Sequence, residues 1–228
     1  MKLTPLNREP AIDEPDRLSL WLDQISRLPG WFVTGTDTGV GKTWIGVRLM
    51  QLLRQRGMRV IPRKPVESGW LDEQVTETDS WRLAASGSGF QPLHAVCPNR
   101  LQRPLSPPRA ALLEGRSLQI ADLAASCLKG IRAGQFVHVE GAGGFYSPLA
   151  MDGLNADLAQ ALKLPVLLVT EDRVGCINHV LLTLEAIRQR GLAVAGVMLN
   201  PIRAATPGMD NLQDLRTLLQ VPVLRWPD

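Results

Sequence analysis

Cysteine is scarce in this chain of 228 residues, and Cys97, Cys127 and Cys176 are the only three. Their number is odd and no two of them form a CxxC pair, so we expect neither a disulfide framework nor a structural zinc site. Few cysteines without such a pattern are typical of a protein in a reducing compartment. We therefore expect a cytoplasmic protein.

Aromatic residues are also few, at 5% with a single Tyr, so a platform for stacking single-stranded bases is not expected. Basic residues number 25 against 22 acidic ones, which gives a net charge of only +3. This excess is too small to predict a surface that binds nucleic acid. No apolar run reaches the roughly 20 residues of a membrane-spanning helix. The start, MKLTPLNREPAIDEPDRLSLW, has acids and prolines where a signal peptide is apolar. We expect a soluble protein with neither nucleic acid nor a membrane as partner.

What the chain does contain is enough apolar material for a sizeable core, with 45% hydrophobic and 21% charged residues. We predict that residues 1 to about 16 are poorly ordered, that Asp16 caps the first helix, and that residues 93–108 form a loop. The apolar periodicity predicts strands over 31–34, 58–63, 136–140, 165–170, 193–199 and 221–224. It predicts helices over 17–27, 42–56, 80–85, 118–132, 155–162, 177–190 and 209–219.

Apolar, non-alternating strands separated by helices predict an α/β fold, a P-loop NTPase-like, mostly parallel central sheet with helices on both faces. With no internal repeat and no obvious linker, we predict a single domain over 1–228, in which 1–29 form an N-terminal extension of uncertain order. Ligands of such sheets bind beyond the carboxyl ends of the strands. This rule places four predicted strand-end residues on one edge: Gly35, Lys64, Glu140 and Asn200.

The strongest motif is GTDTGVGKT, which begins at Gly35 between a predicted strand and a predicted helix. Glycines let backbone N–H groups turn toward phosphate oxygens, and the helix N-terminus adds its positive end. Lys42 is placed to reach the β- and γ-phosphates, and the Thr43 hydroxyl to ligate Mg²⁺. Five residues separate Gly35 from Gly41, where the usual phosphate loop has four. The alternative is a glycine-rich turn that binds nothing, and Asp37 either bonds its own loop or contacts a ligand.

Four further residues lie near predicted strand ends. Lys64 is placed to face the same phosphates, and the alternative is a solvated lysine. Ser68 is placed to donate a hydrogen bond to a substrate, and the alternative is a serine in a turn. Asp79 and Glu140 are the carboxylates that could hold Mg²⁺ beside the threonine hydroxyl. A helix cap and an exposed strand-end acid are the alternatives for these two. His138, within a predicted strand, is expected to be a packed or edge histidine.

Several segments together carry a family resemblance: WFVTGTDTGVGKT, RKPVESG, TDSWRLA, SPPRAALLEG, VEGAGGFYSPL, GCINHVLLTLEAIRQRGL and GVMLN. With them, the chain resembles the dethiobiotin synthetase family, ATP-dependent enzymes that close the ureido ring in biotin synthesis. The resemblance runs from about Trp31 to Leu224, and the five-residue spacing of the phosphate loop is typical of this family. It implies a cyclo-ligase that carboxylates 7,8-diaminopelargonic acid with CO₂, by way of a carbamate and a carbamic–phosphoric anhydride.

The resemblance also implies roles for individual residues. The implied catalytic groups are Lys42, Lys64, Thr38 and Ser68. ATP would be bound by Gly39, Val40, Gly41, Lys42 and Thr43, with Asn200 at the adenine, and Mg²⁺ by Thr43, Asp79 and Glu140. The family implies a homodimer whose substrate carboxylate is bound across the interface at a helix N-terminus. The implied substrate contacts are Ser68, Gly143, Gly175, Cys176, Ile177 and Asn178.

Some features depart from the family pattern. Gly39 stands where some members carry a glutamate, and Pro108 where many carry a histidine. The chain ends at Asp228, before a segment that usually clasps the base, so we expect looser base selectivity. The alternative function is a MinD/ParA-like switch ATPase, but these carry a lysine early in the loop where this chain has Thr36 to Thr38. A glutamine-dependent amidoligase of the cobyrinate type would need a further glutaminase domain, for which 228 residues leave no room.

Overall fold

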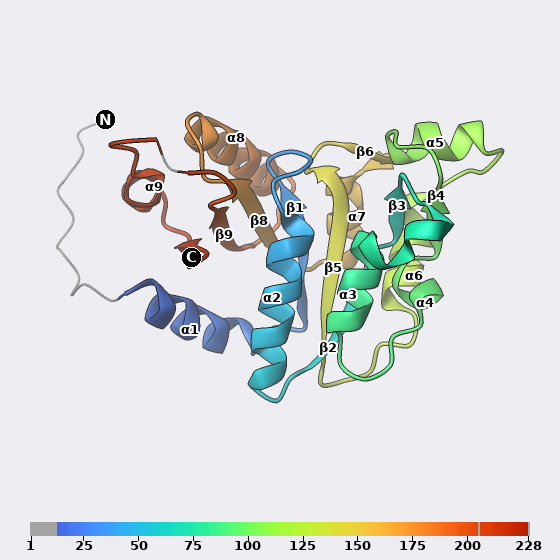
Figure 1. The fold of residues 1–228 in the computed structure, drawn as a ribbon, viewed down its shortest axis with the longest axis horizontal. Coiled ribbons are helices and arrows are strands. Elements are labelled where there is room, and N and C mark those ends of the chain that lie inside the picture. Colours follow the sequence, from blue (N-terminus) through green and yellow to red (C-terminus); the bar gives the residue numbers. More distant parts are fainter. Residues whose placement is uncertain (1–12, 205, 228) are drawn as a thin grey trace.

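The structure, a computed structural model, describes residues 13–204 and 206–227. Across these residues the central sheet has six parallel strands in the order β10-β9-β8-β1-β5-β2 (Figure 1). The strands are β1 (Gly30–Gly35), β2 (Arg59–Arg63), β5 (Gln135–Gly144), β8 (Val166–Glu171), β9 (Val194–Asn200) and β10 (Val223–Arg225). The expected parallel sheet of a P-loop NTPase fold is confirmed.

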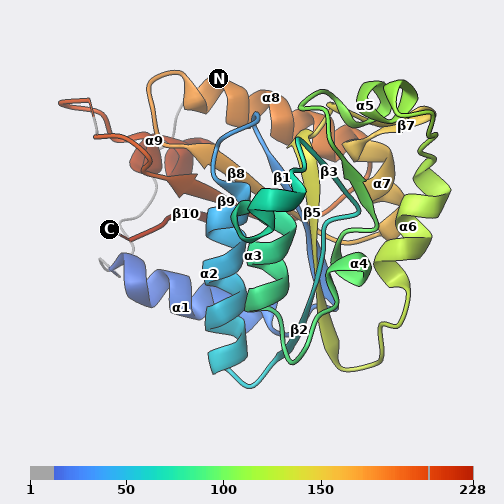
Figure 2. The same ribbon diagram turned by 45° about the vertical axis from the view of Figure 1, so that its right-hand side comes forward.

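Helices cover both faces of the sheet, because side chains along each buried strand point alternately to the two sides. In β1, Trp31 and Val33 belong to one hydrophobic cluster and Phe32 to the other. The first face carries α1 (Glu14–Ile25), α2 (Lys42–Gln55) and α3 (Asp79–Ser86), and Figure 2 shows α2 and α3 side by side on it. The second face carries α6 (Ile120–Leu128), α7 (Asn155–Leu162), α8 (Cys176–Gln189) and α9 (Asn211–Leu218).

The region predicted as a loop over 93–108 is the largest error of the sequence analysis. It holds α4 (Leu93–Val96), β4 (Asn99–Leu101) and the start of α5 (Pro107–Leu113). Strand β4 pairs with β3 (Val66–Ser68), a distant partner that no local pattern reveals. Prolines begin α5, where the missing N–H is tolerated. The short elements η1 (Asp72–Glu77), β6 (Pro148–Ala150) and β7 (Gly153–Leu154) were also not predicted.

Two further predictions about element ends were wrong. The cap of α1 is Asp13, whose carboxylate accepts from the Asp16 backbone N–H at 2.9 Å, so residues 13–16 are part of the helix start. The rest of the segment predicted to be poorly ordered, residues 1–12, lies outside the described residues. Strand β5 does not stop at Glu140 but continues through the glycines, because Gly144 still pairs with Gly35 of β1.

The N-terminal helix α1 is part of the first face of the sheet. The indole N–H of Trp21 in α1 donates to the Ala195 carbonyl of β9 at 2.8 Å. The Trp21 ring stacks on the ring of Trp31, with the ring centroids 5.8 Å apart. Glu14 pairs with Arg216 of α9 at 2.8 Å. These contacts give the N-terminal extension a packing role that the sequence analysis did not assign. Within the described part of the chain, no helix has the length and apolar character needed to cross a membrane.

Candidate active site

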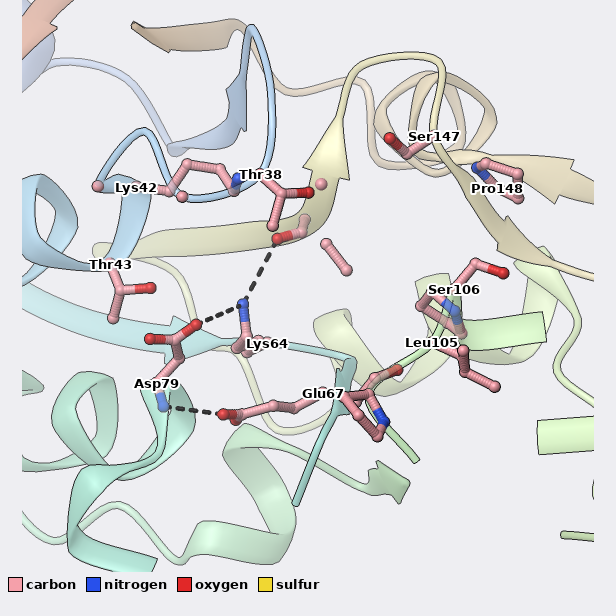
Figure 3. A pocket seen from close by; sticks show the side chains of 18 of the residues that line it. Thr38, Lys42, Thr43, Lys64, Glu67, Asp79, Leu105, Ser106, Ser147 and Pro148 are labelled. Carbon is pink, nitrogen blue, oxygen red and sulfur yellow. Dashed lines mark hydrogen bonds and ion pairs between the residues drawn. The ribbon is translucent and has the colours of Figure 1, made fainter. Parts of the chain in front are cut away.

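A cavity of about 670 Å³ lies beyond the carboxyl ends of β1, β2 and β5 (Figure 3). Its position follows from the parallel sheet, since the carboxyl ends of all these strands meet at one edge. Lining residues that the sequence analysis singled out are Thr38, Gly39, Gly41, Lys42, Thr43, Lys64, Ser68, Asp79 and Gly143. The structure therefore brings most of the predicted catalytic and phosphate-binding residues together.

The phosphate loop connects β1 to α2 with two residues in the left-handed region, Gly39 at φ 77° and Gly41 at φ 85°. Only glycine fits Gly41, because a Cβ there would overlap the side-chain amide of Asn200. Asp37 bonds its own loop, accepting from the Thr38 backbone N–H at 2.7 Å. The loop is thus held in part by contacts among its own residues.

Lys42 is the basic residue of the loop, and its ammonium donates to the Asp37 backbone carbonyl at 3.0 Å. Burial lowers the pKa of Lys42 to about 8, although the nearby Glu140 carboxylate opposes this effect. A buried ammonium that has only a backbone carbonyl as acceptor gains from the arrival of a phosphate anion. Lys42 is therefore suited to bind the terminal phosphates of a nucleotide.

The carboxylate of Glu140 is the centre of the polar cluster. Its Oε1 accepts from Thr43 Oγ1 at 2.7 Å and from Lys64 Nζ at 2.6 Å. Asp79 Oδ2 lies 3.6 Å from the same Lys64 nitrogen (Figure 3). Burial alone would lower the pKa of Lys64, but the carboxylates of Glu140 and Asp79 outweigh it and raise that pKa. The three predicted metal ligands therefore belong to one polar cluster, in which Glu140 and Asp79 contact the Lys64 ammonium and Thr43 contacts Glu140.

The donor set of this cluster fits Mg²⁺. It offers a hydroxyl and two carboxylates, the hard oxygen ligands that Mg²⁺ prefers together with water and phosphate oxygens. Glu140 Oε2 is buried and lacks a hydrogen-bond partner among the described residues. No group of three or more His, Cys, Asp or Glu residues that could hold a metal is found in that part of the chain. The two carboxylates and the hydroxyl would therefore complete a Mg²⁺ coordination sphere only together with water or phosphate oxygens.

Ser68 and Thr38 both line the cavity. Ser68 ends β3, and its Oγ is buried without a hydrogen-bond partner in the described residues. Thr38 projects from the phosphate loop near Gly143, where a Cβ would lie 3.6 Å from Thr38 Oγ1. The buried Ser68 hydroxyl has unused hydrogen-bonding capacity for a ligand, because pairing it would remove the cost of its burial.

Two residues that build the site were missed by the sequence analysis. Glu67 accepts from the backbone N–H groups of Asp79 and Ser80 at 2.8 and 2.9 Å, which fixes the start of α3. Asn155 is fully buried and bonds the carboxyl end of β5, accepting from Ala142 N–H at 3.0 Å and donating to Ala142 O at 2.7 Å. The one sequence signal for Glu67 is its place between Lys64 and Ser68.

Some predicted residues lie away from this cavity in the described chain. Asn200, at the end of β9, donates to the Val40 backbone carbonyl at 3.0 Å from the other side of the phosphate loop. The predicted carboxylate-binding residues Gly175, Cys176, Ile177 and Asn178 lie at the start of α8 and do not line the cavity. Their predicted role involves a second copy of the chain, so it stays a prediction.

Comparison with known proteins shows the family of this chain. A family model described as an AAA domain matches residues 30–225. The ATP-dependent dethiobiotin synthetase BioD of Anaeromyxobacter dehalogenans (strain 2CP-1) is 45% identical over 173 residues, 75% of this chain and 76% of that protein. The BioD protein of Cellvibrio japonicus is 40% identical over 197 residues, which cover 85% and 86% of the two chains. The chain belongs to the dethiobiotin synthetase family.

Membership of the dethiobiotin synthetase family, whose members are ATP-dependent ligases, agrees with the phosphate loop and the basic and acidic groups around it. Among solved structures, a nucleotide-binding protein from Archaeoglobus fulgidus in complex with ADP superposes with a TM-score of 0.52. It is 12% identical, and the match covers 92% of this chain and 85% of that one, so it shows the fold alone.

Proposed function

We propose that the chain catalyses the ATP- and Mg²⁺-dependent carboxylation and ring closure of 7,8-diaminopelargonic acid with CO₂. The products would be dethiobiotin, ADP and phosphate. The observation that carries the proposal is that Lys42, Thr43, Lys64 and Asp79 line one cavity beside the phosphate loop, with the buried Glu140 carboxylate bonded to Thr43 and Lys64 behind them. Membership of the dethiobiotin synthetase family supports this choice of substrate, and the site contains the groups that the chemistry would use.

In this proposal the triphosphate lies along the loop from Gly39 to Thr43, where backbone N–H groups and the N-terminus of α2 stabilise its charge. Lys42 binds the γ-phosphate. Asn200, already bonded to the loop at Val40, reads the adenine edge. Thr43, Asp79 and Glu140 would hold Mg²⁺, which supplies charge neutralisation for phosphoryl transfer.

The reaction needs two amines and one activated carboxyl group. One amine of the substrate attacks CO₂ and loses a proton, which gives a carbamate. A carbamate oxygen attacks the γ-phosphorus, the bond to ADP breaks, and a carbamic–phosphoric anhydride forms. The second amine then attacks the carbonyl carbon, closes the ring and expels phosphate. The protein contributes mainly by positioning and by charge stabilisation.

The residues around the cavity match these steps. Lys64 and Lys42 neutralise the carbamate oxyanion and the transferring phosphoryl group from two sides. The unpaired hydroxyl of Ser68 donates to the carbamate, and Thr38 donates on the phosphate side. Gly143, which lines the cavity next to Thr38, would contact the substrate through its backbone.

We further propose that the substrate carboxylate is bound by a second copy of the chain. We assign this carboxylate to the start of α8, over Gly175, Cys176, Ile177 and Asn178. The Cys176 backbone N–H already donates to the Arg173 carbonyl at 3.1 Å, so the N–H groups of Ile177 and Asn178 would bind the anion. The proposal therefore includes a homodimer whose two active sites form at the interface. Sedimentation at several protein concentrations tests it, and a monomer with full activity would contradict it.

The decisive experiment measures ATP turnover and dethiobiotin formation with and without the diamine and bicarbonate. Turnover should require both together, because the phosphoryl acceptor is the carbamate. A switch ATPase of the MinD/ParA type would hydrolyse ATP without either compound, and that result would overturn the proposal. Lys42→Ala should abolish turnover while Lys129→Ala, which removes an exposed lysine, leaves it unchanged.

A further inference from the structure

Two tryptophans meet beside the phosphate loop, and the proposed reaction uses neither of them. Trp44 lies in the first turn of α2, directly after Thr43, and Trp226 directly follows β10. Their ring centroids are 5.8 Å apart with an interplanar angle of 84°, which is the edge-to-face arrangement that aromatic pairs favour. Trp44 is 41% exposed and Trp226 is only partly buried, so this tryptophan pair presents aromatic surface to solvent.

Contacts with neighbouring residues hold the tryptophan pair in place. The Arg48 guanidinium carbon lies 3.3 Å from the centroid of the Trp44 ring, and Arg48 Nη1 donates to the Trp44 backbone carbonyl at 3.3 Å. Trp226 is fixed through its backbone N–H, which donates to the Leu199 carbonyl of β9 at 2.9 Å. Its side chain packs against the hydrophobic cluster of the first face of the sheet. Side chains that are already ordered lose little conformational freedom when a ligand binds to them.

Asn200 connects the tryptophan pair to the phosphate loop. It is the last residue of β9 and comes directly after Leu199, which accepts the hydrogen bond from Trp226. The side-chain amide nitrogen of Asn200 donates to the Val40 carbonyl of the loop at 3.0 Å. A carbonyl can only accept, so this bond uses the amide nitrogen and leaves the amide oxygen of Asn200 as an acceptor. An aromatic surface therefore lies beside a polar group that can bond the edge of a base.

The direction in which a bound nucleotide would run follows from the groups already assigned. In the proposed function Thr43 helps to hold Mg²⁺ at the terminal phosphates, and Asn200 contacts the base. The ribose must then lie between these two residues. Trp44 borders the cavity that holds the phosphates and also contacts Trp226, which lies beside Asn200. The tryptophan pair thus lies at the end of the site where the base would be.

We propose that Trp44 and Trp226 form a stacking surface for the base of the nucleotide, with Asn200 at its edge. The inference rests on the proposed function in so far as the nucleotide is ATP. Stacking tolerates any base, because every base has an aromatic face, and loss of one stacking side chain typically weakens binding about 10- to 100-fold. The two tryptophans therefore provide affinity for a base, and the Asn200 amide provides the preference for adenine.

The first test compares the binding of ADP with the binding of inorganic pyrophosphate, which has the diphosphate of ADP without the nucleoside. Calorimetric titration at one MgCl₂ concentration measures both ligands on the wild type, Trp44→Leu and Trp44→Phe. We expect ADP to bind about 10- to 100-fold more weakly to Trp44→Leu, and Trp44→Phe to recover most of the affinity because it keeps an aromatic ring. Pyrophosphate should bind equally to all three proteins, since the phosphate loop is unchanged.

The second ring and a matched control complete this test. Trp226→Leu should also weaken the binding of ADP and leave the binding of pyrophosphate unchanged. Trp81→Leu is the control, because Trp81 is 39% exposed, nearly as much as Trp44, but lies in α3 and is not among the residues that line the cavity. It should bind both ligands as the wild type does.

Three results would overturn the inference: unchanged ADP binding in Trp44→Leu or in Trp226→Leu, equal losses of ADP affinity in Trp44→Leu and Trp44→Phe, or a loss of pyrophosphate affinity that matches the loss of ADP affinity. These results are distinct from a failure of the proposed function. If the variants lose ADP affinity as expected while ATP turnover in the wild type needs no diamine, the proposed reaction fails and the stacking surface stands. If turnover requires the diamine and bicarbonate while ADP binding is indifferent to both tryptophans, the stacking surface alone fails.

Discussion

Lys64 Nζ lies 2.6 Å from Glu140 Oε1, and the two side chains are 5% and 0% exposed. A buried ion pair stabilises a fold only when both partners remain, because one partner alone is an uncompensated buried charge. Asp79 lies on the other side of the same ammonium, at 3.6 Å. Lys64 therefore provides positive charge between the two carboxylates to which we assign Mg²⁺, and it should compete with the metal for them.

Replacing Lys64 tests whether its ammonium competes with Mg²⁺ for Glu140 and Asp79. Lys64→Met leaves Glu140 and Asp79 without their cation, so we expect the metal-free protein to lose about 3–5 kcal/mol of stability. Mg²⁺ should then raise the unfolding temperature of the variant more than that of the wild type, because binding to the folded state stabilises it. Thermal unfolding with and without MgCl₂ measures both effects. In the double variant Lys64→Met/Glu140→Gln, Mg²⁺ should no longer raise the unfolding temperature by more than it does in the wild type. If Mg²⁺ raises the unfolding temperature of Lys64→Met and of the wild type equally, Lys64 does not compete with the metal.

Glu67 should affect the site through Asp79. Its carboxylate accepts the Asp79 and Ser80 backbone N–H groups, so Glu67→Ala leaves the start of α3 without these bonds (Figure 3). We expect a stability loss of about 1–2 kcal/mol and a higher Mg²⁺ concentration for half-maximal activity. Glu77→Ala removes an exposed acid next to the same helix and should change neither quantity. A Glu67→Ala variant with a normal Mg²⁺ requirement would show that Asp79 needs no such support.

Residues at predicted strand ends were the part of the site that sequence reasoning could place. The local pattern of the phosphate loop predicts β1 and α2, and the strand-end rule for parallel sheets predicts that Lys64 and Glu140 lie at the same edge, where they form an ion pair. The pairing of β3 with β4 could not be found this way, since it joins segments far apart in the chain. Glu67 was missed for the same reason, because its partners are backbone groups of a helix whose start depends on tertiary packing.

Replacing Asn155 should affect the binding of one substrate, the diamine, more than the binding of the other, ATP. The Asn155 side-chain amide donates to the backbone carbonyls of Ala142, Gly144 and Ser147, and so holds the end of β5 and the residues that follow it beside the cavity. Asn155→Ala should cost about 1–3 kcal/mol and raise the KM for the diamine more than the KM for ATP. Asn211→Ala is the matched control, because Asn211 is also a buried asparagine at the start of a helix but lies in α9. A diamine KM that rises equally in both variants would indicate a general loss of stability.

The buried imidazole of His138 should make the fold sensitive to acid. Burial lowers the pKa of His138 to about 3 in the folded protein, whereas an unfolded histidine titrates near 6.5. Below about pH 6.5 the unfolded chain therefore binds a proton that the folded chain does not, and stability falls as pH falls until about pH 3. From pH 7 to pH 5 this group alone should remove about 2 kcal/mol of unfolding free energy. Urea unfolding of wild type and His138→Leu at both pH values measures it: the variant should lose less stability than the wild type by about that amount. Equal losses would mean that the ring takes up a proton in the folded state.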